Sequence, residues 1–579
     1  MIINRSIVQS PIVLFFSHIP DMNYHVIYDN PDEDLLTRLF KVRWIDDNID
    51  SFLNPKFSEY RWDPFLLHDM DKAVERIVQA MKKNEKIMIF GDYDVDGVTS
   101  SYLIYKFLTK FLKYDNVSIQ YPHRIDDWYG LKKKHIDDIQ SKNVNLIITV
   151  DNGISSIQEA KYAKEKHIDL IITDHHQHLE ELPDAVAVIT PLISPDYPFK
   201  GLAGVGVAFK LICAITEKST LPKDQKNKVF NYFLPVVAIG TVADVVPLIN
   251  ENRAIVKRWL ERINKNHDQL PTSLKWFLKY LNLKNNVDTF HIGFIIGPRI
   301  NAGGRIESPY DSLKALLYSG EKQIEHLDKI EEINTERKKM QEAAFKKAEN
   351  LINLDEKILI AIDEDFHEWI VWIVAGKLTE KYNKPSMILK IDKEKNLGIA
   401  SLRCPEYFNV IEMISTETAI LERFGWHKRA WGLSVKLEHL ETLITNFQNH
   451  CTTHISETDL IKSVKVDTKI YHHEREYETL TKIDKFAPFG EGNKEPVFLL
   501  ENVSIKKIEK VGNNGKSHLK IHCLFGDKKI TTMFRGRWSE VEELITHHGD
   551  TPVSLVGKIR IDTFNGWFYL EWADIRQID

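Results

Sequence analysis

Cysteine is scarce in this chain of 579 residues, and its four cysteines (Cys213, Cys404, Cys451 and Cys523) lie far apart with no CxxC pair. This argues against a disulfide framework and a zinc ribbon, and it favours a reducing, cytoplasmic compartment. No run of about 18 or more apolar residues occurs, so we expect no membrane span. A basic excess is also missing, because 77 Lys and Arg stand against 83 Asp and Glu. Overall charge therefore does not indicate a nucleic-acid-binding protein, although a basic cleft can lie on an acidic surface.

The length predicts several domains, because a single hydrophobic core rarely serves more than about 300 residues. The N-terminus resembles a signal peptide only weakly, since Pro11 interrupts the apolar stretch and no small-residue cleavage site follows. We expect residues 1–21 to be a loose arm or a non-native upstream extension, which mass spectrometry of the native N-terminus would test. Residues 1–75 are interpreted as this arm and an aromatic-rich lead-in.

The stretch 86–99 combines a short apolar strand with three alternate carboxylates. Residues 87–90 are apolar, and Asp92, Asp94 and Asp96 follow them between two glycines that permit a tight turn. Carboxylates this close raise each other's pKa unless a cation lies among them, so a hard divalent metal is the simplest explanation. An acidic, solvated loop between a strand and a helix is the alternative for this stretch alone.

Alternating apolar strands and helices predict an α/β fold with a parallel sheet. Further strands are expected at 117–121, 146–150, 170–173 and 186–189. Asp92, Asp151 and Asp174 each come directly after a predicted strand, and the carboxyl ends of parallel strands meet at one crevice. Asp244 lies between valines in Gly-Thr-Val-Ala-Asp-Val-Val-Pro and needs a partner if it is buried. The convergence favours a metal site over a set of unrelated acids.

Two glycine-rich stretches predict different roles. Residues 201–206, Gly-Leu-Ala-Gly-Val-Gly, have no strand directly ahead and make a weak dinucleotide fingerprint, so we expect tight packing under the next helix. Residues 297–305, Gly-Pro-Arg-Ile-Asn-Ala-Gly-Gly-Arg, look like an anion-binding loop, with an ordinary exposed loop as the alternative. A long charged helix over about 319–351 is interpreted as a strut between domains rather than a coiled coil.

The α/β pattern restarts at residue 357 and gives way to β-rich runs after residue 467. Strands at 358–362 and 386–390 around a helix at 370–382 predict a smaller α/β domain. The later runs, separated by turn signals, predict a small β-barrel. Basic residues interleaved with His518 and Phe534 suit single-stranded nucleic acid, and a solvated basic face is the alternative. The basic residues are Lys506, Lys507, Lys510, Lys516, Lys520, Arg535 and Arg537.

Four motifs occur in the order that resembles the DHH phosphoesterases: Gly-Asp-Tyr-Asp-Val-Asp-Gly, Val-Asp-Asn-Gly-Ile, Thr-Asp-His-His and Ala-Asp-Val-Val-Pro. With residues 297–305, Ala-Pro-Phe-Gly-Glu-Gly-Asn at 487–493 and Glu-Pro-Val-Phe at 495–498, the chain is similar to the RecJ single-strand-specific exonucleases from residue 32 onward. The resemblance implies an α/β fold of four parts. These are a parallel-sheet DHH domain (76–310), a connecting long helix (311–352), a smaller α/β DHHA1 domain (353–455) and an OB-fold β-barrel (465–579).

The same resemblance implies a metal-dependent exonuclease that removes nucleotides from the 5′ end of single-stranded DNA in recombination and repair. It implies Mn²⁺ or Mg²⁺, as two ions, and we expect a monomer with a helicase or a single-strand-binding protein as a further partner. His176 would contact the scissile phosphate or assist proton transfer, and Asp92 would lie at least beside the metal ligands. The ligands carried over by position are Asp94, Asp96, Asp151, His175 and Asp244.

The resemblance also implies substrate-binding residues, and it fails in one region. Phosphate contacts are carried over to Arg299, Asn301 and Arg305. In the DHHA1 part, the substrate-binding residues that match the family are Ser401, Arg403, His427 and Lys428. On the barrel, the candidates are Lys516, His518 and Lys520. The family pattern Gly-Trp-His-Pro-Gly-Val-Ile-Gly appears here as Asp-Phe-His-Glu-Trp-Ile-Val-Trp at 365–372. Small residues would let a nucleic-acid backbone approach closely. Here Trp369, Trp372, Trp426 and Trp431 would fill that space or offer stacking surfaces.

Two other functions are compatible with the motifs. The chain could be a phosphodiesterase of short oligonucleotides or cyclic dinucleotides, against which the C-terminal barrel argues. It could also be a non-hydrolytic single-strand-binding scaffold, against which the retained acids argue.

Overall fold

The computed structural model describes residues 23–123, 130–178, 180–265, 270–283, 287–306, 308–427, 430–474, 476–511, 518–535, 552–562 and 567–577. These residues form two compact units. Unit 2 consists of residues 43–347 and 481–495, and unit 1 of the described residues before 43, from 348 to 480 and after 495. None of the described helices has the length and apolarity that a membrane span requires.

A five-stranded parallel sheet in the order β3-β2-β4-β5-β6 forms the centre of unit 2. The register sets Gly91 beside Val150 and Val150 beside Thr173, so that three strands end at the same edge. This confirms the predicted parallel sheet. The strands are β2 (Ile87–Gly91), β3 (Val117–Gln120), β4 (Leu146–Val150), β5 (Asp169–Thr173) and β6 (Ala187–Ile189).

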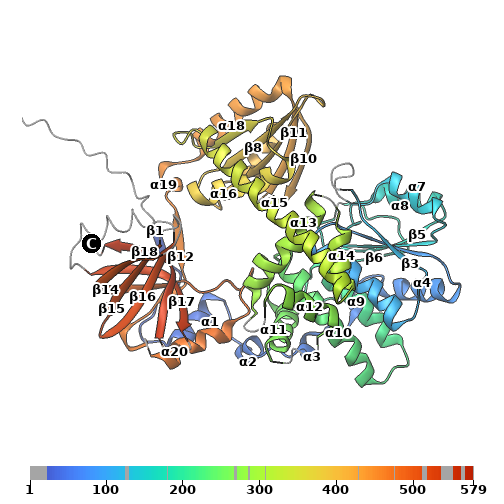
Figure 1. Cartoon of the computed structure of the whole chain (residues 1–579), viewed down its shortest axis with the longest axis horizontal. Helices are drawn as coiled ribbons and strands as arrows, with labels where there is room; N and C mark the ends of the chain where they lie inside the picture. The colour runs from blue at the N-terminus through green and yellow to red at the C-terminus, as the bar shows by residue number, and fades with distance from the viewer. Residues whose placement is uncertain are drawn as a thin grey trace, which may run out of the picture. The chain divides into compact units, whose positions relative to one another are not determined.

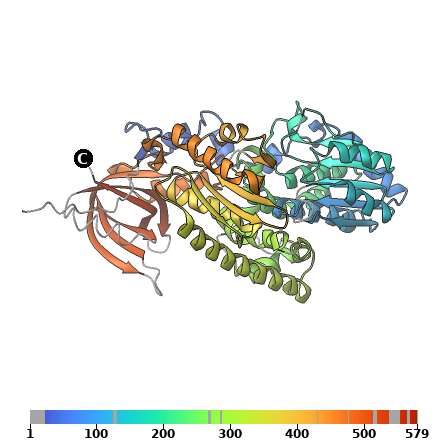
Figure 2. The same ribbon diagram turned by 90° about the horizontal axis from the view of Figure 1, so that it is seen from above.

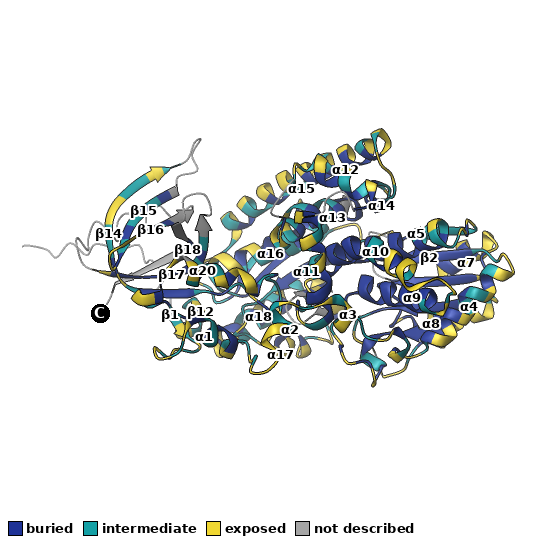
Figure 3. Cartoon of the chain, turned by 90° about the horizontal axis from the view of Figure 1, so that it is seen from below, coloured by how far each residue is buried: buried dark blue, intermediate teal, exposed yellow. Residues whose placement is uncertain are grey.

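Helices cover both faces of this sheet, as Figure 1 shows. Alternate residues of β2 enter two different cores, with Ile87 and Ile89 in one and Met88 and Phe90 in the other. Burial on both faces explains why β2 and β4 read as continuous apolar runs, and Figure 3 shows β2, α9 and α10 mostly buried. One core includes α4 (Met70–Lys82), α5 (Val95–Lys106), α9 (Gly204–Lys218) and α10 (Lys223–Ala243), and the other includes α7 (Lys133–Ser141) and α8 (Ile157–Glu165).

Residues 297–305 are helical, which differs from the predicted loop. They form most of α13 (Gly297–Ile306), and a Cβ on Gly304 would collide with the Tyr93 carbonyl. Gly304 therefore serves close packing against the acidic stretch rather than a turn. The neighbouring elements are α11 (Asn250–Lys265), α12 (Thr272–Tyr280), η5 (His291–Ile296), α14 (Tyr310–Leu317) and the long helix α15 (Glu321–Leu351).

Residues 481–495 belong to unit 2, although they precede the barrel strands in sequence. Arg253 donates to the carbonyls of Ala487 and Pro488 at 3.0 and 3.2 Å, and Leu248 N–H donates to the Glu491 carbonyl at 2.7 Å. The motif at 487–493 is thus held by the helical part of unit 2.

Unit 1 contains a mixed five-stranded sheet in the order β10-β11-β9-β8-β7. Only β7 and β8 pair in parallel, and the later strands are antiparallel. This is the predicted smaller α/β sheet. Its strands are β7 (Leu359–Asp363), β8 (Ser386–Asp392), β9 (Leu397–Arg403), β10 (Leu421–His427) and β11 (Ala430–Lys436), and its helices include α16 (Glu368–Tyr382) and α18 (Leu440–His454).

A closed five-stranded barrel follows in unit 1, and its curved red strands are seen in Figure 2. Strand pairing runs β14-β15-β16-β18-β17 and returns to β14, with β16 and β18 parallel, which is an OB-type topology and confirms the predicted barrel. The strands are β14 (Phe498–Val511), β15 (His518–Phe525), β16 (Lys528–Arg535), β17 (Val553–Asp562) and β18 (Trp567–Gln577).

A buried ion pair joins α9 to α11 in unit 2. Lys210 Nζ lies 2.6 Å from Glu251 Oε1, and the two side chains are 1% and 0% exposed. Tyr197 donates to Glu251 Oε2 at 2.5 Å, and Lys210 also donates to the Trp62 carbonyl at 2.8 Å. Because α9 begins against Asp151 at the sheet edge, this pair braces a helix that borders the edge.

We predict that Glu251→Gln lowers the stability of the protein by about 3–5 kcal/mol, because Lys210 is left buried without its counter-charge. Thermal unfolding should show the loss as a lower Tm. Glu59→Gln is the matched control, since Glu59 forms an exposed pair with Lys56 and such pairs contribute about 0–1 kcal/mol. Equal Tm values for the two variants would contradict the prediction, and the double variant Lys210→Met/Glu251→Leu should recover part of the loss.

Candidate metal centre

The first acids of the site lie where β2 passes into α5. Asp92 directly follows β2 and is buried, Asp94 caps α5 by accepting from Gly97 N–H at 3.0 Å, and Asp96 lies in the first turn, also buried. A Cβ on Gly97 would collide with the Asp92 backbone. Glycine is therefore required at this position, and the turn brings all three carboxylates to the carboxyl end of the sheet.

Asp151 leaves β4 in an uncommon backbone conformation. Its φ of 62° lies in the left-handed region, which Asp tolerates better than most residues, and its N–H donates to the Thr173 carbonyl of β5 at 3.0 Å. The next residue, Asn152, donates to the carbonyls of Phe90 and Val150 at 3.1 and 2.9 Å. These bonds hold the ends of three neighbouring strands together around Asp151, and strain of this kind is typical of functional sites.

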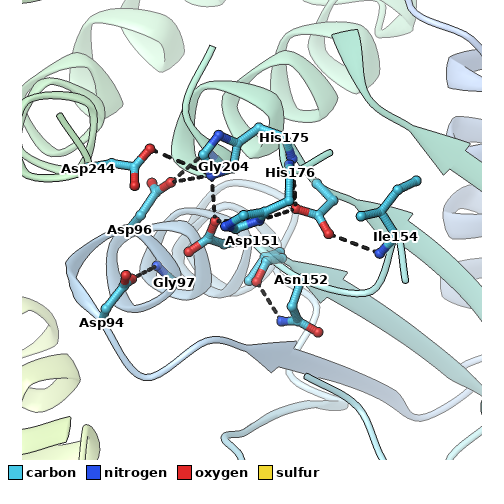
Figure 4. Close-up of polar contacts among 12 residues, drawn as sticks. Asp94, Asp96, Gly97, Asp151, Asn152, Ile154, His175, His176, Gly204 and Asp244 are labelled. Carbon is cyan, nitrogen blue, oxygen red and sulfur yellow. Dashed lines mark hydrogen bonds and ion pairs between the residues drawn. The ribbon is translucent and has the colours of Figure 1, made fainter. Parts of the chain in front are cut away.

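Carboxylates and imidazoles from four separate segments meet at this edge, as Figure 4 shows. His175 Nε2 lies 3.1 Å from Asp151 Oδ1 and 3.6 Å from one oxygen each of Asp96 and Asp244. Three sets of possible ligand atoms lie within 4.8 Å of one another. They are Asp96–His175–Asp244, Asp151–His175–His176 and Asp92–Asp94–Asp151. Because the sets share Asp151 and His175, all seven side chains named from the sequence form one continuous cluster.

Burial and mutual repulsion oppose ionisation of these acids. Burial, followed by the charge of Asp94, raises the pKa of Asp96 to about 7. Burial and the charge of Asp96 raise the pKa values of Asp151 and Asp244 well above their usual range. A cation among the carboxylates would reverse this effect, since an opposite charge favours the ionised form. Oxygen donors with one or two imidazoles fit Mn²⁺ or Mg²⁺, so the residues present suit a hard divalent ion.

The start of α9 binds Asp96 directly. Gly204 N–H and Val205 N–H donate to the two carboxylate oxygens of Asp96 at 2.6 and 2.8 Å, where a helix N-terminus favours negative charge. A Cβ on Gly204 would lie 2.6 Å from Asp151 Oδ1, so glycine is needed for the approach. The expected tight packing of residues 201–206 is present, but the amides also hold a candidate ligand. No sequence pattern indicates this contact, because Asp96 lies 108 residues before Gly204.

Asp174 directly follows β5, and the sequence left its role open. It is fully buried, accepts from Ile154 N–H at 2.9 Å, and places Oδ1 2.8 Å from His176 Nδ1. Burial alone would raise the pKa of Asp174, but His176 outweighs it and lowers that pKa to about 2. Burial would likewise lower the pKa of His176, but Asp174 outweighs it and raises that pKa to about 9. Asp174 therefore orients His176 and keeps a proton on Nδ1.

The structure shows the contacts of two residues that the resemblance assigns to phosphate binding. Arg299 binds Glu331 of α15 through Nε and Nη2 at 2.6 and 3.1 Å, because the helical α13 turns this side chain toward α15. Asn301 Oδ1 accepts from Val95 N–H at 3.0 Å and so fixes the acidic stretch. The side chain of Arg305 lies outside the described residues.

In unit 1 the described tryptophans differ in their surroundings. Trp431 on β11 is 3% exposed and fills the core of the sheet, whereas half-buried Trp372 lies under the Arg403 guanidinium, 5.4 Å from ring centroid to carbon. Ser401 is buried on β9, and Trp369 lies in the first turn of α16. Lys520 on β15 lies opposite Glu509 of β14 and Met533 of β16 in the strand register. The side chains of Trp426, His427 and His518, together with Lys428 and Lys516, lie outside the described residues.

Two protein-family models match this chain, one in its N-terminal half and one near its C-terminus. The model of the DHH family N-terminal domain matches residues 86–241, and that of the RecJ OB domain matches residues 466–572. The single-stranded-DNA-specific exonuclease RecJ of Haemophilus influenzae is 32% identical over 514 residues, which cover 84% of this chain and 86% of that protein. The protein of the same name in Bacillus subtilis is 34% identical over 89% of this chain, which spans 64% of that relative's length.

Solved structures agree with this placement. RecJ of Thermus thermophilus in complex with Mn²⁺ matches with a TM-score of 0.78 and 22% identity, over 96% of this chain and 80% of that one, and it shows the shared fold. A structure of exonuclease RecJ bound to manganese matches with a TM-score of 0.58 and 25% identity, over 68% of this chain and 98% of that one. Since a relative matches along most of both lengths and the DHH and RecJ OB regions follow in order, this chain belongs to the RecJ family.

Proposed function

We propose that this chain is a cytoplasmic, metal-dependent exonuclease that releases nucleotides from the 5′ end of single-stranded DNA in recombination and repair. The observation that carries the proposal is the meeting of Asp151, His175 and Asp244 with the acids of the 92–96 stretch at one sheet edge. Relatives named single-stranded-DNA-specific exonucleases support the choice of substrate.

The residues that would hold two Mn²⁺ or Mg²⁺ ions are Asp92, Asp94, Asp96, Asp151, His175 and Asp244. A bound divalent ion supplies Lewis-acid charge, which favours attack by water and stabilises the leaving oxygen. The amides of Gly204 and Val205 fix the orientation of Asp96. His176, whose Nδ1 proton is kept by Asp174, can hold or transfer a proton at a phosphodiester oxygen through its other ring nitrogen.

The parts of the chain would share the work as the family pattern implies. The DHH domain (76–310) would carry the hydrolysis, the helix at 311–352 would connect it to the DHHA1 domain (353–455), and the OB-fold (465–579) would hold the trailing strand. Ser401 and Arg403 on β9 and Lys520 on β15 are the described candidates for contacts to this strand. Binding should weaken as salt rises, since phosphate contacts release counterions. We propose a monomer that works with a helicase or a single-strand-binding protein.

We expect Asp151→Ala to abolish Mn²⁺-dependent nucleotide release, by about a thousandfold or more, because metal-ion charge supplies several kcal/mol of transition-state stabilisation. Single-strand binding, measured by fluorescence anisotropy, should remain detectable. Asp138→Ala is the matched control, since Asp138 is a half-exposed acid of the same unit that pairs with Lys142. Turnover of Asp151→Ala at the rate of the control would refute the metal assignment.

Asp174→Asn is expected to lower kcat by about 10²–10⁴-fold, the range for general acid–base catalysis, because His176 loses the partner that orients it. KM and the bound metal, determined by plasma mass spectrometry, should change little. A proportional loss of metal and activity would show instead that Asp174 only holds the ligand cluster together.

A single degradation assay separates the proposed activity from its alternatives. We expect 5′-labelled single strand to lose its label with Mn²⁺ and to stay intact with a chelator, and duplex to be resistant. Hydrolysis of a dinucleotide but not of longer strands would identify a small-substrate phosphodiesterase. Binding without any hydrolysis would identify a scaffold.

A further inference from the structure

Four large apolar side chains of unit 2 are exposed to solvent. Val245 is 65% exposed, Ile249 40%, Phe290 57% and Phe294 70%. We call these four residues the apolar ledge. Exposed apolar groups are unremarkable when they are scattered singly, but a contiguous set marks an interaction site.

The ledge lies beside the metal centre. Val245 directly follows Asp244, and η5, which carries Phe294, runs into Gly297. A Cβ on Gly297 would lie 3.5 Å from the Cβ of Ala243, the residue before Asp244, and 4.0 Å from Cγ2 of Val95, which separates Asp94 from Asp96. The turn that follows Phe294 therefore touches two of the segments that supply the acids.

The segment 481–495 connects the remaining members. Thr289 Oγ1, next to Phe290, donates to the Phe489 carbonyl at 2.6 Å. A Cβ on Gly492 would lie 3.5 Å from Ile249 Cγ2. Both ends of the ledge are thus tied to one short segment of the same unit.

The backbone is irregular both at Val245 and in η5, which carries Phe294. Val245 has a φ of 60°, a left-handed conformation that a β-branched residue adopts only under strain, and η5 is a π-helix. Strained residues and π-helical turns both concentrate at functional sites, because the surrounding structure must hold them in place. The irregularity presents the side chains outward rather than into a core.

The two phenylalanines already stack on each other. Their ring centroids are 4.8 Å apart and their planes differ by 23°, and they lie four residues apart on one helical face. Phe294 is the more exposed of the two, so a further planar group can extend the stack on its open side. Nucleobases are planar groups of this kind, and they stack on aromatic side chains whatever their sequence.

We propose that the apolar ledge, through Phe294, stacks unpaired bases of the strand whose phosphodiester lies at the metal centre. This deepens the proposed function and rests on it. The ledge would also favour single strands, because the bases of a duplex are already stacked and paired and offer it no free face.

The test compares two strands of equal length, an oligothymidylate and a base-free deoxyribose-phosphate strand, by fluorescence anisotropy in the Asp151→Ala background. Phe294→Ala should raise the Kd of the base-bearing strand about tenfold, which is about 1.4 kcal/mol and within the range for one stacked base. The Kd of the base-free strand should not change. Phe294→Trp should keep the wild-type Kd, whereas Phe294→Leu, which keeps apolar volume without a ring, should behave like Ala.

Trp276→Ala is the matched control, because Trp276 is a partly exposed aromatic residue of the same unit whose ring already has Lys279 4.9 Å from its centroid. The slope of log Kd against log salt should be the same in Phe294→Ala and the parent, since no phosphate contact is lost. An equal rise of Kd for both strands, or full affinity in Phe294→Leu, would overturn the proposal. If the chain with Asp151 intact hydrolysed no single strand, while Phe294→Ala still weakened binding of the base-bearing strand alone, the proposed function would be overturned and the ledge would stand.

Discussion

Repulsion among buried carboxylates is the constraint on which the arrangement of unit 2 depends. Asp96, Asp151 and Asp244 come from a helix start, a strand end and a helix end, and burial together with like charge raises the pKa of each. The amides at the start of α9 donate to Asp96 and so offset part of the rise in its pKa, but they do not do this for Asp151 or Asp244. The remaining charge requires a cation, because unpaired buried carboxylates cost several kcal/mol each. The metal is therefore the component that the acidic cluster demands.

The two adjacent histidines contact different aspartates, which distinguishes the roles that we propose for them. His175 faces Asp96, Asp151 and Asp244 through Nε2, as a ligand would. His176 is bound through Nδ1 to Asp174, which keeps a proton on that nitrogen. In the proposed mechanism one histidine would serve as a ligand and the other as a proton carrier, because the backbone after β5 turns His175 into the acids and His176 onto Asp174.

The sequence predicted what depends on local pattern. Asp92 and Asp151 follow continuous apolar strands, and parallel strands end together, so the cluster could be placed before any coordinates. Contacts made at long range could not be placed. The pair between Arg299 and Glu331 depends on the direction of α15, and the glycines of α13 are equally compatible with a loop until Tyr93 is seen beside Gly304. Residues 481–495 belong to unit 2 partly because Arg253 donates to the carbonyls of Ala487 and Pro488. No local sequence pattern predicts this contact, because the partners are 234 and 235 residues apart.

The negative charge of the carboxylate cluster also explains why an apolar ledge suits this place. Carboxylates repel the phosphates of a nucleic acid, so the strand needs attraction near the cluster that does not come from the acids. A lysine or arginine in place of Val245 would lie next to Asp244 and compete with the divalent ion for that carboxylate. The cation of Arg299 on α13 is paired with Glu331. Stacking on Phe294 attracts the strand without adding positive charge, which leaves the acids to the metal.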